Sequence, residues 1–289
     1  MGAPSGAILI TGCSTGIGRA TAQRLAGKGW TVYATARRAE SITDLSQVGC
    51  KTLALDVNDE GSMAAAVAHV EHEHGAVWGL INNAGYSQSG AIESVPLDSV
   101  RAQFETNVFG LLRMCQLALP GMRDAGGGRI VNISSMGGRM VFPGGGAYHA
   151  TKYCVEAISD AMRFEVAGFG VSVVLIEPGL IRTEFGTTAA GSLAENTPDD
   201  DRDDPYSKFN ASVGAITRGA YEGTVGRIFG GKPDAVARKI ERALSSARPR
   251  ARYRVTASAS LIMAQRRLMP DRLWDAAMGA QFPKPGSDS

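Results

Sequence analysis

Short apolar runs, rich in β-branched residues, alternate along the chain with stretches of helical periodicity. The runs at 7–11 (AILIT) and 171–179 (VSVVLIEPG) are apolar at most positions, which indicates strands that are buried on both faces. Such strands, separated by helices, predict a parallel sheet, and right-handed crossovers make it a doubly wound α/β sheet of the Rossmann type. The predicted strands are 7–11, 31–35, 51–57, 77–83, 128–135, 171–179 and 251–255.

The alternation continues along the chain without a linker that would divide it, so we predict one domain over residues 1–289. The region 184–231 breaks the alternation, and we expect it to be a substrate-loop insertion over the carboxyl edge of the sheet. Residues 256–289 are expected to form a C-terminal helical extension. The predicted helices are 17–28, 59–75, about 99–123, 147–168 and 233–246.

Charge and cysteine content bound the function. The net charge is only +2, which gives no case for nucleic-acid binding. The four cysteines form no CxxC pair, and reduced thiols in a reducing compartment are expected. We find neither a secretory signal pattern nor an apolar run of the roughly 20 residues that a membrane span needs, so we expect a cytoplasmic protein.

A glycine-rich loop joins the first predicted strand to the first predicted helix. In TGCSTGIG (11–18), Gly12, Gly16 and Gly18 would let the backbone approach a pyrophosphate at a helix N-terminus, where unpaired N–H groups and the helix dipole favour an anion. The spacing differs from the common GxGxxG fingerprint. A plain tight turn is the alternative interpretation.

The end of the second strand bears on cofactor choice. NAD sites usually carry an acidic residue there for the ribose hydroxyls, whereas this chain has Ala36 followed by Arg37 and Arg38. Because arginine pairs well with phosphate, NADP(H) is favoured over NAD(H). The alternative is that both arginines are merely solvated.

Six motifs stand in an order that resembles the short-chain dehydrogenase/reductase family. They are TGxxxGIG at 11–18, NNAG at 82–85, Asn107, ISS at 133–135, YxxxK at 148–152 and PGLIRT at 178–183. The resemblance covers about residues 7–185. VYATARR and GGGAYHATKYCVEA are most similar to the branch that contains retinol and 17β-hydroxysteroid dehydrogenases.

The resemblance implies a cofactor site along the carboxyl edge of the sheet. Asp56 and Val57 would meet the adenine, Asn83 to Gly85 the ribose, and Thr183 the nicotinamide carboxamide. The cofactor-binding residues that it implies are Gly12, Ser14, Thr15, Gly16, Ile17, Gly18, Arg37, Arg38, Asp56, Val57, Asn83, Ala84, Gly85, Tyr148, Lys152, Pro178, Gly179, Ile181 and Thr183.

The resemblance also implies four catalytic residues. Tyr148 would be the general acid/base, Lys152 would hold the ribose, Ser135 would polarise a carbonyl, and Asn107 would hold a water in a proton relay. Residues i and i+4 share a helix face, so Tyr148 and Lys152 can converge. Since a free phenol has a pKa of about 10, a nearby ammonium and an oxidised nicotinamide would lower the pKa of Tyr148 toward neutrality.

These roles predict an NADP(H)-dependent carbonyl reductase or alcohol dehydrogenase acting on a lipophilic alcohol, ketone or aldehyde of steroid, retinoid or fatty type. A non-catalytic NADP-sensing protein on the same fold is the alternative. The resemblance implies a homodimer or homotetramer through the helices near 99–123 and 147–168. The expected substrate-pocket residues are Ser135, Tyr148, Tyr86, Met136, Val141, Phe142 and Phe185.

Three further segments allow more than one interpretation. His69, His72 and His74 could hold zinc, but a solvated helix end is favoured and no metal is expected. The acidic segment 194–205 is expected to be a solvated lid rather than a metal site. Residues 232–272 hold eleven basic and three acidic residues, and the C-terminal helices could contact a membrane surface, cover the pocket or pack in an oligomer.

Overall fold

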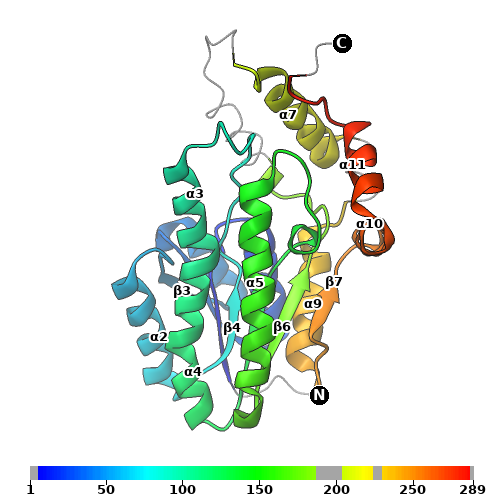
Figure 1. The fold of residues 1–289 in the computed structure, drawn as a ribbon. Helices are drawn as coiled ribbons and strands as arrows, with labels where there is room; N and C mark the ends of the chain where they lie inside the picture. Colours follow the sequence, from blue (N-terminus) through cyan, green and yellow to red (C-terminus); the bar gives the residue numbers. More distant parts are fainter. Residues whose placement is uncertain (1–5, 187–203, 224–229, 287–289) are drawn as a thin grey trace.

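A parallel sheet of seven strands forms the centre of the protein in a computed structural model that describes residues 6–186, 204–223 and 230–286 (Figure 1). The strand order is β3-β2-β1-β4-β5-β6-β7, and every neighbouring pair runs parallel. The predicted doubly wound α/β fold is confirmed. The strands are β1 (Ala7–Ile10), β2 (Thr31–Ala36), β3 (Lys51–Ala54), β4 (Val77–Asn82), β5 (Gly128–Ile133), β6 (Val171–Glu177) and β7 (Arg252–Arg254).

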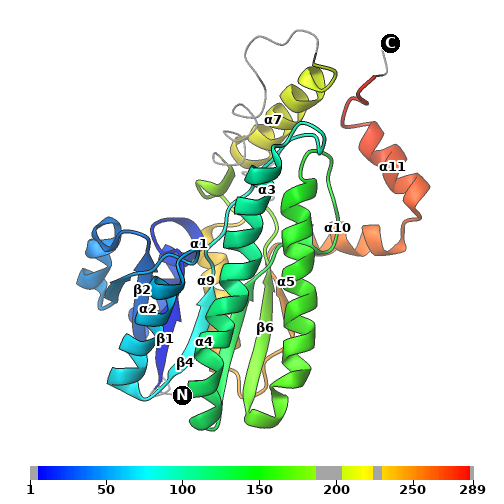
Figure 2. The ribbon, with the colours of Figure 1, turned by 60° about the vertical axis from the view of Figure 1, so that its left-hand side comes forward.

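Helices cover both faces of the sheet, as Figures 1 and 2 show. Within β1, Ile8 and Ile10 belong to one buried cluster with α1 and α9, whereas Ala7 and Leu9 belong to another with α2, α4 and α5. Alternate residues of one strand therefore enter two separate cores, which is why the strands are apolar throughout. These helices are α1 (Gly16–Ala26), α9 (Pro233–Ser245), α2 (Glu60–His74), α4 (Leu111–Asp124) and α5 (Gly146–Glu165).

Further helical segments lie between these strands and helices along the chain. The helix predicted over 99–123 is in fact three segments: α3 (Leu97–Phe104), a π-helical turn η2 (Glu105–Gly110) and α4. A ten-residue 3₁₀ segment, η1 (Ala39–Val48), was not predicted. Short 3₁₀ turns are η3 (Met136–Gly138) and η4 (Ala167–Phe169).

The part of the chain beyond β6 gathers at the carboxyl ends of the strands and along the β7 edge. Helix α7 (Ser207–Glu222) lies above the sheet, while α10 (Ala257–Leu268) and α11 (Asp271–Gly279) lie on the β7 side (Figure 1). Phe209 of α7 belongs to one buried cluster with Met278 and Phe282, so the C-terminal extension packs against α7. Residues 187–203, and with them nearly all of the predicted acidic lid, lie outside the described residues.

The order of the strands places a crevice at the carboxyl ends of β1 and β4. From β1 the chain proceeds outward to β2 and β3, then returns to β4 on the other side of β1. Loops that leave β1 and β4 therefore diverge, and ligands of doubly wound sheets bind at this reversal. Several strands end earlier than predicted there, β3 at Ala54 and β6 at Glu177, because the next residues turn into the crevice wall.

Candidate active site

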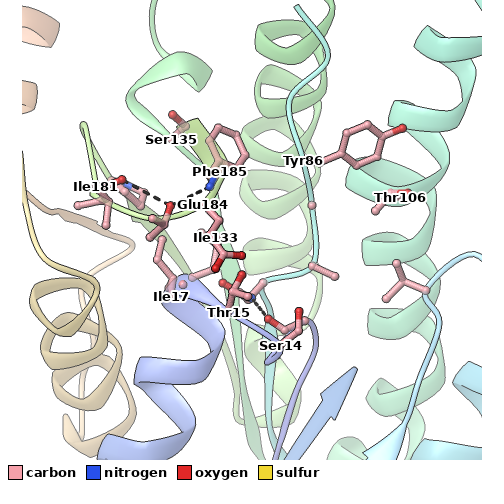
Figure 3. Close-up of a pocket in the computed structure, with 18 of the residues that line it drawn as sticks. Ser14, Thr15, Ile17, Tyr86, Thr106, Ile133, Ser135, Ile181, Glu184 and Phe185 are labelled. Carbon is pink, nitrogen blue, oxygen red and sulfur yellow. Dashed lines mark hydrogen bonds between the residues drawn. The ribbon is translucent and has the colours of Figure 1, made fainter. Parts of the chain in front are cut away.

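The crevice holds a cavity of about 720 Å³ that collects most of the predicted site residues. Figure 3 shows Ser14, Thr15 and Ile17 in its lower part, and Ser135 and Phe185 in its upper part. The predicted residues that line it are Gly12, Ser14, Thr15, Gly16, Ile17, Arg37, Asp56, Val57, Asn83, Ala84, Gly85, Tyr86, Ser135, Tyr148, Lys152, Pro178, Gly179, Ile181, Thr183 and Phe185.

The glycine loop has the backbone that the motif requires. Gly12 and Gly16 have φ angles of 73° and 58°, in the left-handed region that favours glycine. Helix α1 begins at Gly16, and its first turn holds no acidic side chain. Gly16 and Ile17 at this end of the helix line the cavity, so the positive end of the helix dipole adjoins it and favours an anion there.

Gly18 has a packing role and lies outside the cavity wall that the described residues form. A Cβ at this position would lie 2.3 Å from the backbone oxygen of Gly12 and 2.5 Å from Nδ2 of Asn83. That Nδ2 atom donates to the backbone oxygens of Thr11 and Gly12, at 3.0 and 2.8 Å. Asn83 therefore braces the glycine loop, and Gly18 leaves the room that it needs.

The two predicted arginines are placed differently. Arg37 is exposed and lines the cavity beside Ala36, whereas Arg38 occupies the N-cap position of η1, makes no side-chain capping bond, and is not among the described residues that line the cavity. Arg19, which the sequence did not single out, donates to the backbone oxygen of Ser14 at 3.3 Å and pairs with Asp44. Arg19 therefore stabilises the glycine loop through the backbone of Ser14.

Tyr148 and Lys152 lie on the first turns of α5, opposite the end of β5. Nζ of Lys152 donates to the backbone oxygen of Ile133 at 2.9 Å and lies 5.8 Å from the centroid of the Tyr148 ring. Ser135 follows β5 and caps the turn η3, where its Oγ accepts a 3.0 Å hydrogen bond from the N–H of Gly137. The structure thus brings the predicted phenol, ammonium and hydroxyl to one end of the cavity.

Burial dominates the electrostatics of this group. Burial raises the pKa of Tyr148, and a hydrogen bond with Ser135 only partly opposes the rise. Burial also lowers the pKa of Lys152 to about 8. The lowered pKa that we predicted for Tyr148 is therefore not produced by these residues alone, because desolvation of the phenolate outweighs the hydrogen bond.

Asn107 stands behind the cavity and not in the wall that the described residues form. The π-helical turn η2 places it there, 1% exposed. Its Nδ2 donates to the backbone oxygen of Tyr86 at 2.9 Å and to Oγ1 of Thr151 at 3.1 Å, and its Oδ1 accepts from the N–H of Tyr86 at 3.0 Å. Asn107 thus joins the loop after β4 to α5.

The substrate side was only partly predicted. Phe185 lines the cavity, with its ring centroid 5.4 Å from that of Tyr148. Val141 and Phe142 lie outside the described lining, because Val141 faces outward and Phe142 packs against Trp274 of α11, with ring centroids 6.0 Å apart. Met136 is likewise outside it and packs with Met140 and Met263.

Sequence reasoning missed several lining residues. Tyr221 reaches the cavity from α7, a helix in the insertion that carries no motif. Ile133 and Ser134 could have been inferred, since they belong to the same ISS motif as the predicted Ser135. The missed lining residues are Ala36, Leu55, Asn58, Ala102, Thr106, Ile133, Ser134, Glu184 and Tyr221.

Two of the three histidines at the end of α2 lie beside a glutamate of the same helix. His69 and His74 approach Glu73, and Nε2 of His74 lies 2.9 Å from the hydroxyl of Tyr33. In the part of the chain that the structure describes, no group of three or more His, Cys, Asp or Glu side chains is arranged to hold a metal ion. Nor does any helix of that part have the length and apolar content to cross a membrane.

The chain is similar to known oxidoreductases. A profile of the short chain dehydrogenase family matches residues 6–192. The uncharacterized oxidoreductase YbbO of Escherichia coli K12 is 34% identical over 269 residues, 93% of this chain and 92% of its own. Retinol dehydrogenase 16 of Rattus norvegicus is 32% identical over 289 residues, 96% of this chain and 89% of its own. The NADPH-dependent 3-dehydrocapnine reductase of Ornithobacterium rhinotracheale is 32% identical over 277 residues, 92% and 94% of the two chains.

Solved structures agree with these similarities. A short-chain dehydrogenase from Streptomyces avermitilis superposes with a TM-score of 0.76 at 30% identity, covering 96% of this chain and 98% of that one. A serine dehydrogenase complexed with NADP⁺ gives 0.74 at 25% identity, with 87% and 95% coverage. An enzyme of this fold from Burkholderia phymatum, in complex with NAD, gives 0.78 at 19% identity, with 98% and 97% coverage. Cofactors of both kinds therefore occur on this fold.

Proposed function

The chain belongs to the short-chain dehydrogenase/reductase family of oxidoreductases, and from that premise we propose that it transfers hydride between NADP(H) and a lipophilic alcohol, ketone or aldehyde. One observation carries the proposal. The phenol of Tyr148, the ammonium of Lys152 and the hydroxyl of Ser135 line one cavity together with the glycine loop at the start of α1, and the ammonium lies 5.8 Å from the centroid of the phenol ring.

The residues present fit a nicotinamide dinucleotide. Gly12 and Gly16, whose positive φ angles favour glycine, carry no side chain that would block the loop, and the N-terminus of α1 favours phosphate. Asp56 and Val57 would hold the adenine end, and Thr183 the carboxamide end. When bound, such a cofactor supplies the hydride donor or acceptor and, in its oxidised form, a positive charge beside the phenol.

Each catalytic side chain then has a defined task. Ser135 and Tyr148 donate hydrogen bonds to the oxygen of the reacting carbonyl, and Tyr148 delivers the proton in reduction or receives it in oxidation. Lys152 holds the ribose and, while charged, favours the phenolate. Asn107 positions this group through Tyr86 and Thr151, and we retain it as a candidate for the proton relay.

Preference for NADP(H) is supported by charge. Ala36 stands where an NAD site usually carries an acid, and the exposed side chain of Arg37 reaches the same end of the cavity. Arginine binds a 2′-phosphate better than a ribose hydroxyl. The name of the 3-dehydrocapnine reductase, which describes it as NADPH-dependent, is in line with this preference.

A lipophilic substrate is supported by three aromatic rings that line the cavity, those of Tyr86, Phe185 and Tyr221, of which Phe185 lies 5.4 Å from the ring of Tyr148. The retinol dehydrogenase among the relatives points the same way. A non-catalytic NADP-sensing protein is the second candidate, and the presence of both Tyr148 and Lys152 disfavours it. NADPH oxidation measured against a panel of ketones and aldehydes of increasing chain length separates the two, because a sensor would bind NADPH and oxidise none of it.

Association is proposed on two surfaces. Helices α4 and α5 would pair in a homodimer or homotetramer, and Tyr153 and Phe164 of α5 are exposed large side chains that suit this role. Light scattering on the purified protein tests it.

The C-terminal helices expose Leu261, Leu268 and Leu273, which suit contact with a membrane surface. The free thiols support the predicted cytoplasmic location.

A further inference from the structure

His149 directly follows the catalytic tyrosine and is 7% exposed. Its imidazole lies between two glycine segments. A Cβ at Gly137 would lie 2.4 Å from Nδ1, and a Cβ at Gly145 would lie 2.7 Å from Nε2. Both positions therefore need glycine because the imidazole occupies the space that a side chain would fill. One ring thus contacts the turn η3 and the loop that leads into α5.

The hydrogen bond of this imidazole has a defined direction. Nδ1 lies 3.1 Å from the backbone oxygen of Gly137. A carbonyl oxygen can only accept, so Nδ1 carries the proton. Burial lowers the pKa of His149 to about 4, so the ring is neutral near pH 7 and Nε2 carries no proton. A single tautomer therefore ties α5 to η3.

Gly137 also contacts Ser135, one of the proposed catalytic residues. The N–H of Gly137 donates to Oγ of Ser135 at 3.0 Å, which leaves the hydroxyl proton of Ser135 to point elsewhere. Ser135 and Tyr148 line the same cavity, and the hydroxyl of Ser135 acts to lower the pKa of the phenol against the larger effect of burial. The turn η3 contains two successive glycines, Gly137 and Gly138, whose backbone is costly to hold in one conformation. The imidazole supplies that restraint.

We propose that His149 is a positioning residue of the reaction, which fixes the carbonyl of Gly137 and thereby aims the hydroxyl of Ser135 at Tyr148 and the substrate oxygen. Helix α5 then carries the acid/base directly through Tyr148 and sets the carbonyl-polarising hydroxyl indirectly through His149. The inference rests on the proposed function, and it assigns a role to a residue that the family motif leaves variable between Tyr148 and Lys152.

The test compares His149→Leu, which keeps an apolar side chain of similar size without a donor, with His149→Asn, whose amide N–H can replace Nδ1–H. We expect kcat to fall about tenfold or more in His149→Leu and to recover to within about threefold of the wild type in His149→Asn, because a mispositioned donor loses transition-state stabilisation. The Kd for NADPH should change less than about twofold in both. Equal kcat in all three proteins, or equal loss in the two variants, overturns the proposal.

A double variant shows whether the effect passes through Ser135. If it does, His149→Leu in a Ser135→Ala background should lower kcat by less than about twofold, since coupled residues are not additive. A full tenfold further loss would overturn the proposed path. If His149→Leu does not fold, His149→Gln against His149→Asn serves the same purpose, because the glutamine amide reaches the Nε2 position, where it leaves Gly137 unpaired.

One readout is independent of turnover. Nitrogen-15 NMR of the imidazole should show the neutral Nδ1–H tautomer at pH 7, and an Nε2–H tautomer or an imidazolium would contradict the proposal. Failure of the wild type to oxidise NADPH with any carbonyl would instead remove the proposed function and leave the tautomer result standing.

Discussion

Nζ of Lys152 donates a hydrogen bond of 2.9 Å to the backbone oxygen of Ile133, and this contact joins the helix of Tyr148 to the end of strand β5. The ammonium is held beside the ring of Tyr148, at 5.8 Å from its centroid, and burial lowers its pKa to about 8. The carbonyl partly compensates the lost hydration of a charge that would otherwise be costly to bury. The catalytic end of the cavity is therefore organised by helix α5 and strand β5 together.

The hydroxyl of Tyr148 is predicted to carry proton transfer. Tyr148→Phe removes only that oxygen, so we expect kcat to fall by about 10²–10⁴, the range of general acid/base catalysis. Binding of NADPH, followed by fluorescence titration, should be nearly unchanged. Tyr153→Phe, at an exposed position one turn away on α5, is the matched control and should retain full turnover. Near-normal kcat in Tyr148→Phe would refute the role.

Arg37 is predicted to select the phosphorylated cofactor. Arg37→Glu should weaken NADPH binding by about tenfold or more while leaving NADH binding similar, because a charge-assisted bond to the 2′-phosphate is replaced by repulsion. Arg38→Glu makes the same charge change next to it, at a residue outside the described cavity lining, and should have a much smaller effect. Equal losses in the two variants, or tighter binding of NADH by the wild type, would count against the assignment.

His149 should make folding stability depend on pH. Its pKa falls from 6.5 to about 4 on folding, and no charged group is among the causes. Between these values the unfolded chain binds more protons, so the free energy of unfolding falls as the pH drops through this window, and the loss is complete below about pH 4. Lowering the pH from about 7 to about 5 should cost the wild type about 2 kcal/mol more than His149→Asn in urea unfolding. Identical pH profiles would show that the imidazole is not buried and neutral.

The exposed leucines of the C-terminal helices are predicted to contact anionic lipid. The protein should sediment with phosphatidylserine vesicles at low salt and less at high salt, since arginines such as Arg267 and Arg272 flank these leucines. Leu268→Asp should weaken the interaction, because Leu268 is 84% exposed. Val48→Asp, at a 44% exposed site on η1 outside both proposed surfaces, is the control and should not. Absence of sedimentation at low salt would dismiss the contact.

The predictable part of this protein is the part that rests on local patterns. Apolar runs alternating with helical stretches are enough to determine a doubly wound sheet, since strands buried on both faces need helices on both sides. The glycine loop from Gly12 to Gly18 and the pair Tyr148 and Lys152 each consist of residues that are close together along the chain. Their relation to the strand and helix that hold them follows from backbone geometry alone.

Only the tertiary structure decided which neighbours meet. Arg37 and Arg38 are both arginines at neighbouring positions, yet Arg37 lines the cavity and Arg38 stands outside its described lining at the N-cap position of η1. Phe142 turns to Trp274, while Tyr221 arrives from a helix with no motif. The raised pKa of Tyr148 and the contact of His149 with Gly137 likewise depend on segments distant along the chain. Burial and side-chain direction are set by what packs against a residue, and a pattern of residue types carries that information only for neighbours within the same element.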